Sequence, residues 1–288
     1  MKAIDFIYKV IPNDWFRKLS RKYYKFVKKW MKKMNEEEFL HFLRTKLNIE
    51  NGDIVFVHSA MSKMNVTFPP QKMLELLKES VGEEGTLLFP CWHYTGRAED
   101  YLRKTDSVFD VLNSKTTLGF LNQLAKNEPG AKRSWHPTVS VCAIGKRAEE
   151  LTSQHHTDIY PCGEKSPWFL MLQYPSKIIG LGEKVVSLSF VHCIEDVMKG
   201  QFPIATLSAE VLSGKVITPE GNSLQVPTHY PQKGIKQRDV VSFFSKNIPR
   251  FIGQQFRYHG VNYFRCDALK LYQKMEQLAK DGKTIYHF

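Results

Sequence analysis

The sequence lacks several features that would assign it to common classes of protein. Its five cysteines are widely scattered and form no Cys-x-x-Cys pair. This usage argues against a disulfide scaffold and a cysteine zinc site, and it favours a reducing compartment. There is no apolar run of the length that crosses a bilayer, and residues near the N-terminus do not form the apolar stretch and cleavage site of a secretory signal. We therefore expect a cytoplasmic protein.

Acidic residues are scarce near the N-terminus, where basic residues gather. Residues 1–34 contain eleven Lys or Arg and two acidic residues, a net charge of +9 out of the formal +12 of the whole chain. Apolar residues recur there at steps of three and four, which predicts an amphipathic helix. Its apolar face would hold Trp15, Phe16, Leu19, Tyr23, Phe26, Val27, Trp30, Met31 and Met34, and its basic residues largely occupy the other faces.

Two interpretations of this basic arm, residues 1–34, remain open. Residues 14–34 could lie on an anionic membrane at its inner face, where each basic residue contributes about 1 kcal/mol. Alternatively, the apolar face docks on the rest of the protein or on a second subunit, which would make a homodimer. Nucleic acid is not an expected partner, because no recognition motif accompanies the charge.

After the arm the sequence alternates between apolar strands and helices. Strands are predicted at 53–58, 85–90, 139–144 and 177–182, and helices at 36–47, 71–80, 118–126, 147–153 and 191–199. Short strands and turns follow at 205–230, and late helices at 238–244 and 266–280. This alternation predicts an α/β fold with three layers, α/β/α, around a mostly parallel or mixed central sheet. We expect one domain over residues 35–288.

Several short segments are weak indicators of function individually, but their order and spacing along the chain are informative. They are Val57-His58-Ser59-Ala60-Met61-Ser62, Gly85–Pro90, Phe109–Gly119, Pro129–Pro137, Gly163–Pro167 and Ser189–Glu195. In this order and spacing they resemble the aminoglycoside 3-N-acetyltransferase family, and the resemblance covers roughly residues 38–280. Three positions depart from the family pattern: Ala60 replaces a serine, Lys115 a proline and Ser189 a threonine.

The resemblance implies an acyltransferase that moves an acetyl group from acetyl-CoA, its co-substrate, to the amine of an amino sugar. No metal is expected. In the family the loop that contains His58, Ser59 and Ser62 approaches CoA. Thr116, Arg133 and Ser134 are further candidates for contacts with CoA.

The chemistry of amide formation requires a group that takes a proton from the acceptor amine. His192 is our first candidate for this general base, since an imidazole titrates near pH 6.5. Glu195 lies three residues later on the same predicted helix, where its carboxylate can orient the ring or stabilise imidazolium. Ser189 could donate a hydrogen bond at the site or cap the helix. His136 is the second candidate base, with substrate positioning as its other role.

Two rival chemistries fit the sequence less well. An acyl-cysteine on Cys193 would need that thiol to face His192, but adjacent helical residues point about 100° apart. A zinc hydrolase is not expected, because the His-Glu-x-x-His signature is missing from the sequence.

The acceptor remains open. An aminoglycoside is a polycation whose site should hold several acidic residues, yet the domain has few acidic clusters. Together with the basic arm, this favours a nucleotide- or lipid-linked amino sugar in surface-polysaccharide biosynthesis. The alternative is an aminoglycoside 3-N-acetyltransferase that confers antibiotic resistance, and a remote alternative is a non-catalytic, membrane-associated scaffold.

Overall fold

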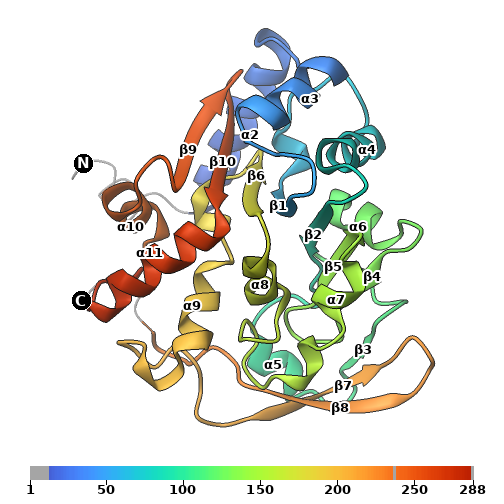
Figure 1. Ribbon diagram of the computed structural model, residues 1–288, viewed down its shortest axis with the longest axis vertical. Coiled ribbons are helices and arrows are strands. Elements are labelled where there is room, and N and C mark those ends of the chain that lie inside the picture. Colours follow the sequence, from blue (N-terminus) through green and yellow to red (C-terminus); the bar gives the residue numbers. More distant parts are fainter. Residues whose placement is uncertain (1–12, 236–237, 287–288) are drawn as a thin grey trace.

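The computed structural model describes residues 13–235 and 238–286. Its centre is a mixed sheet of seven strands in the order β4-β5-β2-β1-β6-β10-β9 (Figure 1). The three central strands, β2 (Thr86–Pro90), β1 (Ile54–Ser59) and β6 (Ser176–Leu181), are parallel. On one side β5 (Val141–Gly145) pairs antiparallel with β2, and β4 (Lys132–Arg133) pairs antiparallel with β5. On the other side β10 (Val261–Asp267) pairs antiparallel with β6, and β9 (Gly253–Tyr258) pairs antiparallel with β10.

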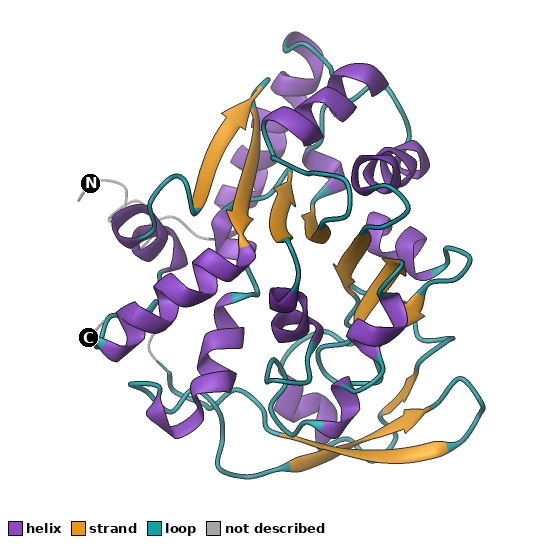
Figure 2. Cartoon of the chain, viewed as in Figure 1, coloured by secondary structure: helices purple, strands orange, loops and turns teal. Residues whose placement is uncertain are grey.

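The central strands are apolar on both faces because side chains alternate along a strand. In β1, Ile54 and Phe56 enter one hydrophobic core, whereas Val55 and Val57 enter the other. A strand buried on both sides appears in the sequence as a continuous apolar run. The two cores, one on each face of the sheet, confirm the predicted α/β class with three layers, in its mixed-sheet form. Figure 2 shows the helices that surround the sheet.

Helices from both halves of the chain cover the two faces. The face that carries Ile54 and Phe56 packs against α7 (Ala148–Thr152), α8 (Pro167–Leu170), α9 (Val191–Met198), α10 (Val240–Asn247) and α11 (Ala268–Lys280). The opposite face packs against α2 (Asn13–Trp30), α3 (Glu36–Thr45), α4 (Pro70–Val81) and α6 (Phe120–Lys126).

A second, small sheet lies at the lower end of the molecule (Figure 1). It contains β3 (Val108–Asp110), β7 (Leu212–Ile217) and β8 (Ser223–Thr228), with α5 (Ala98–Leu102) beside it. Phe109, Val111, Val216 and Val226 form its own apolar cluster. The predicted short strands at 205–230 are therefore present, and they build a separate layer rather than an extension of the main sheet.

The C-terminal region differs from the prediction. The helix expected from residue 266 begins at Ala268, and residues 253–267 form a β9–β10 hairpin that the apolar pattern did not reveal. Arg238, expected in a helix, instead pairs with Tyr286 in an isolated bridge before α10 begins at Val240. The turn of the hairpin holds Gly260 at φ +76°, a conformation that few residues with a Cβ adopt.

The N-terminal helix α2 is amphipathic, as predicted, and one side of it docks on this hairpin. Val27 is buried, and a Cβ on Gly260 would come within 2.9 Å of its Cγ2. The hydroxyl of Tyr23 donates to the carbonyl of Gly260 at 2.8 Å, and Asn262 donates to the hydroxyl of Tyr24 at 2.9 Å. Docking on the protein's own body, one of the two predicted roles of the arm, is thus observed for this face.

Candidate active site

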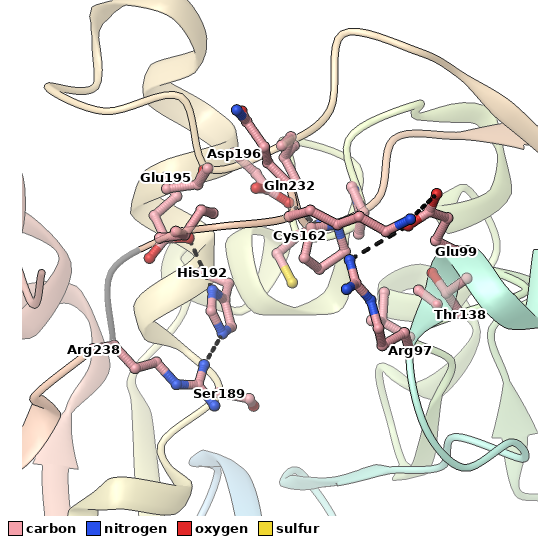
Figure 3. Close-up of a pocket in the computed structure, with 18 of the residues that line it drawn as sticks. Arg97, Glu99, Thr138, Cys162, Ser189, His192, Glu195, Asp196, Gln232 and Arg238 are labelled. Atoms are coloured by element: carbon pink, nitrogen blue, oxygen red, sulfur yellow. Dashed lines mark hydrogen bonds and ion pairs between the residues drawn. The ribbon is translucent and has the colours of Figure 1, made fainter.

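His192 and Glu195 lie on one face of α9, as their spacing predicted. The Nδ1 atom of His192 is 2.9 Å from Oε2 of Glu195, and the side chain of Glu195 is only 3% exposed (Figure 3). The second carboxylate oxygen, Oε1, accepts a hydrogen bond from the hydroxyl of Tyr286 at 3.0 Å. The carboxylate is therefore fixed at both oxygens, and it fixes the imidazole in turn.

The remaining nitrogen of His192 identifies the tautomer. Nη1 of Arg238 lies 2.5 Å from Nε2 of His192, and a guanidinium can only donate. Nε2 is thus an acceptor in a neutral ring whose proton sits on Nδ1, facing Glu195. Burial lowers the pKa of His192, but the carboxylate of Glu195 outweighs it, so the pKa lies above its usual 6.5.

His192 stands where two cavities meet. The larger cavity, about 550 Å³, lies beside Glu195 and Asp196 and extends to Arg97, Glu99 and Thr138 on its far side (Figure 3). The smaller one, about 280 Å³, is lined by His58, Ser59, Asn122 and Glu183. Both cavities share four lining residues, Trp92, Ser189, His192 and Arg238. A group bound in either cavity can therefore reach the imidazole.

The topology explains why these residues meet. His58 and Ser59 end β1, Trp92 follows the end of β2, and Ser189 lies in the segment that follows β6. These three strands are parallel, so their carboxyl ends lie at one edge of the sheet. The carboxyl edge of parallel strands is the usual place for a binding site in an open α/β sheet.

The carboxylates of the larger cavity are largely neutralised. Glu99 lies 3.3 Å from Arg97, 3.2 Å from Arg103 and 3.0 Å from Lys233. The hydrogen bond from Lys233, followed by that from Arg103, holds the pKa of Glu99 below its usual value despite its desolvation.

Asp196 lies deeper in the wall of the same cavity. Burial raises the pKa of Asp196 to about 7. One of its oxygens accepts from the backbone N–H of Cys162 at 2.7 Å, while Oδ1 has no partner in the structure. The charged side chains that line the larger cavity thus leave no strong excess of negative charge.

The residues predicted to contact CoA separate into two groups. His58 and Ser59 line the smaller cavity, where burial lowers the pKa of His58 to about 4 and its Nε2 atom has no hydrogen-bond partner. Ser62 is exposed on a 3-10 turn, η1 (Met61–Lys63), and Thr116 donates to the carbonyl of Trp92 at 3.0 Å. Neither Ser62 nor Thr116 lines these two cavities.

Arg133 and Ser134 have internal roles in place of the predicted CoA contacts. The guanidinium of Arg133 donates to the carbonyl oxygens of Cys91 and Ser114 and stacks over the ring of Phe109. Ser134 is fully buried, where its hydroxyl accepts from the N–H of Val141 at 2.9 Å. Internal partners thus engage both groups, and neither residue lines the two cavities.

His136, the second candidate base, lies outside both cavities and is fully buried. Its Nδ1 accepts from the N–H of Val139 at 3.3 Å, and its Nε2 is 3.2 Å from the hydroxyl of Thr228. Its ring stacks on His155 with the centroids 4.7 Å apart. Burial lowers the pKa of His136 well below its usual value. Both nitrogens have internal partners and the ring lines neither cavity, so the geometry gives His136 a packing role.

Ser189 and Cys193 flank the general-base candidate. Ser189 does not cap α9, whose N-cap position is Phe190; its hydroxyl accepts from Nε1 of Trp168 at 3.2 Å. Cys193 is buried, and burial raises the pKa of its thiol well above its usual value. A protonated, buried thiol is a poor nucleophile.

Three residues of the site were missed in the sequence analysis. Arg238 and Tyr286 are 46 and 91 positions from their partners His192 and Glu195, and no local pattern marks them. Trp92 carried a usable signal, since it follows a buried strand closely. Its Nε1 is buried without a hydrogen-bond partner. Among residues 13–235 and 238–286, no group of three or more His, Cys, Asp or Glu is placed to hold a metal ion.

Comparison with known sequences assigns this chain to a family. The family model for aminoglycoside 3-N-acetyltransferase matches residues 56–278. Aminoglycoside N(3)-acetyltransferase III of Salmonella sp is 31% identical over 164 residues, which cover 53% of this chain and 57% of the relative. Aminoglycoside N(3)-acetyltransferase VII of Streptomyces paromomycinus is 30% identical over 166 residues, 52% of this chain and 57% of the relative. The chain thus spans little more than half the length of these curated relatives.

Solved structures share the fold at lower identity. The crystal structure of aminoglycoside acetyltransferase AAC(3)-Xa superimposes with a TM-score of 0.75 at 20% identity, over 92% of this chain and 98% of the other. The AAC-IIIb binary complex with CoASH superimposes with a TM-score of 0.72 at 19% identity, over 89% of this chain and 100% of the other. The YokD protein from Bacillus subtilis superimposes with a TM-score of 0.71 at 20% identity, over 91% of this chain and 100% of the other. With a family match over most of its length, this chain belongs to the aminoglycoside 3-N-acetyltransferase family.

Proposed function

We propose that the protein is an acetyl-CoA-dependent N-acetyltransferase that acetylates an amine of an amino sugar. The observation that carries the proposal is the position of the His192–Glu195 pair at the junction of two cavities. A transferase that forms a ternary complex needs two sites that open onto one proton acceptor. The smaller cavity would take the thioester end of acetyl-CoA, and the larger one the amino sugar.

The proposed reaction is direct transfer. The neutral amine attacks the thioester carbonyl carbon, the C–N bond forms and the C–S bond breaks. His192 Nε2 accepts the proton that the amine nitrogen loses, and the resulting imidazolium returns a proton to the CoA thiolate. Glu195, held by Tyr286, stabilises that imidazolium. Arg238 must leave Nε2 before the base can act, because the guanidinium occupies the same lone pair.

The donor side offers groups that fit a thioester. Nε1 of Trp92 and Nε2 of His58 are buried, have no hydrogen-bond partner among the residues that the structure describes, and belong to side chains that line the smaller cavity. Buried polar atoms without partners are uncommon in native proteins and are often satisfied by a ligand. A donor at this place can stabilise the oxyanion that forms on the thioester carbonyl. The Ser59 hydroxyl, 3.3 Å from Oδ1 of Asn122, adds a second polar group.

For the acceptor, the names of the relatives make an aminoglycoside the first candidate. One observation favours a second candidate, an amino sugar on a nucleotide or lipid carrier. Three cations surround Glu99, and Arg238 adds another positive side chain to the larger cavity. A polycation binds best to carboxylates that have no other counterion. In either case we propose a cytoplasmic location for the reaction.

The test is an acceptor panel with the full-length chain. Acetyl-CoA is mixed with aminoglycosides, a neutral amino sugar and a nucleotide-linked amino sugar, while thiol release is followed and the N-acetyl product is identified by mass spectrometry. We expect turnover on at least one amine, and turnover that is slower by at least about 10² with the His192→Ala variant. If no amine is acetylated, the transferase proposal fails.

A variant in the larger cavity ranks the acceptors. Lys233→Met removes one counterion of Glu99, so kcat/KM should rise for polycationic acceptors and fall for nucleotide-linked ones. An unchanged ratio would show that the charge of this cavity does not select the acceptor.

A further inference from the structure

Helix α2 has a second apolar surface that the protein's own body does not cover. The side chains of Trp15, Leu19, Phe26 and Trp30 are 58%, 45%, 55% and 66% exposed. At 100° per residue these four positions fall within a sector of about 60° of the helix. They form a continuous stripe, which we call the aromatic stripe, that borders the docked side of the helix with Tyr23, Tyr24 and Val27. Three large aromatic side chains exposed in a row are unusual on a monomer surface.

Basic side chains border the aromatic stripe. Lys18, Lys22, Lys25 and Lys29 are exposed, and their helical positions fall along one edge of the stripe. None of these four lysines forms an ion pair in the part of the chain that the structure describes; the ion pair at this end of the chain joins Lys32 to Glu38. The ammonium group of Lys29 lies 5.0 Å from the centre of the Trp30 ring. The stripe and its lysines thus present apolar and positive surfaces side by side.

We propose that the aromatic stripe binds the surface of an anionic lipid bilayer, with α2 lying in the plane of the headgroups. Trp and Phe side chains enter the boundary between headgroups and acyl chains, and lysines at that depth contact lipid phosphates. No described helix is both long and apolar enough to cross a membrane. Docking of Tyr23 and Val27 on the hairpin leaves the stripe free, so the same helix can hold the enzyme body and a membrane at once.

A second copy of this chain fits the stripe less well. In a symmetric dimer each stripe would meet its own copy, which brings the two rows of lysines close together. Like charges at that distance repel, and no acidic residue of the helix faces them among the side chains described. An anionic membrane instead supplies the opposite charge along the whole length of the stripe.

The experiment is co-sedimentation of the full-length chain with vesicles of phosphatidylglycerol or of phosphatidylcholine alone. We expect pelleting with phosphatidylglycerol, weaker pelleting as salt rises, and little with phosphatidylcholine. The double variant Phe26→Ser and Trp30→Ser should lose at least about tenfold in vesicle affinity, since it removes two aromatic side chains that the bilayer would bury. Lys22→Glu with Lys29→Glu should lose a similar factor on phosphatidylglycerol only.

The control is the Phe120→Ser variant. The side chain of Phe120 is 52% exposed, and its helix, α6, packs toward the opposite edge of the sheet from α2. This variant should bind vesicles like the wild type. Because every substituted side chain is exposed, the melting temperatures should stay unchanged. Removal of the whole arm is avoided, since Val27 and Met34 are buried in the core.

Three outcomes overturn the proposal. The wild type fails to pellet with phosphatidylglycerol, or the stripe variants pellet as well as the wild type does. In the third outcome, sedimentation velocity shows that the wild type is a dimer and the stripe variants are monomers, while vesicle binding is the same. A second copy of this chain would then be the occupant of the stripe. Acetyl transfer to a soluble acceptor should be equal in all variants, so this test is independent of the proposed activity.

Discussion

The surroundings of His136 and of His192 differ although both residues are histidines in segments that carry the family resemblance. His136 follows β4 inside the protein, stacked on His155, with both ring nitrogens hydrogen-bonded to neighbouring groups. His192 lies at the start of α9 with its side chain 31% exposed and a buried carboxylate behind it. The His136 ring is enclosed, whereas the His192 ring is open to the two cavities, with Arg238 at its Nε2.

The pKa values of His136 and His192 differ in the same way as their surroundings. Burial without a counterion lowers the pKa of His136 well below its usual value, which disfavours its imidazolium form. The carboxylate of Glu195 more than offsets the burial of His192 and raises its pKa. A base that must take and return a proton near neutral pH needs such a value. The comparison teaches that a counterion behind the ring and a nitrogen that faces a cavity make a histidine a candidate base.

Replacement of the open histidine should have the largest effect on catalysis. His192→Ala should lower kcat/KM by at least about 10², the usual contribution of a general base. Acetyl-CoA binding should persist, because the smaller cavity keeps its other lining residues. Thiol release gives the rate, and the rise in melting temperature with added acetyl-CoA reports binding.

The matched control replaces the enclosed histidine. His136→Asn leaves buried donors without partners and should cost about 1–3 kcal/mol of unfolding free energy. The activity per folded molecule should stay close to that of the wild type. If His136→Asn abolishes transfer in a folded protein while His192→Ala does not, the two roles are reversed.

Removal of the negative charge behind His192 should have an intermediate effect. Glu195→Gln keeps a hydrogen-bond acceptor near Nδ1 but removes the carboxylate that raises the pKa of His192. The pKa should fall, so the acidic limb of the profile of kcat/KM against pH should move to lower pH. The plateau rate should drop by about tenfold, because the imidazolium loses its counterion. An acidic limb that does not move would separate Glu195 from the titration of His192.

Removal of the positive charge in front of the ring should have the smallest effect and the opposite sign. Arg238 lowers the pKa of His192 and donates to Nε2, so Arg238→Met should raise that pKa and move the acidic limb to higher pH. The plateau should change by no more than about threefold, because the lost hydrogen bond is one that substrate binding also breaks. A large fall in kcat would instead assign Arg238 a contact with substrate. Opposite displacements in the Glu195 and Arg238 variants would identify His192 as the group that titrates.

The sequence by itself determined the features that depend on local periodicity. Runs such as Ile54–Val57 specify strands buried on both faces, because alternate side chains enter opposite cores. The spacing of three between His192 and Glu195 sets both side chains on one face of a helix. The steps of three and four from Trp15 to Met34 specify an amphipathic helix in the same way.

Tertiary structure decided the features that depend on which distant segments meet. Arg238 and Tyr286 reach the His192–Glu195 pair from the far C-terminal part of the chain. Arg133 and His136 turn inward because carbonyls, hydroxyls and rings from other elements engage them. The hairpin β9–β10 covers one side of α2 and leaves the aromatic stripe exposed. Periodicity specifies the face on which a side chain lies. What that face meets depends on the packing of the whole chain, because burial and charge act through space and not along the sequence.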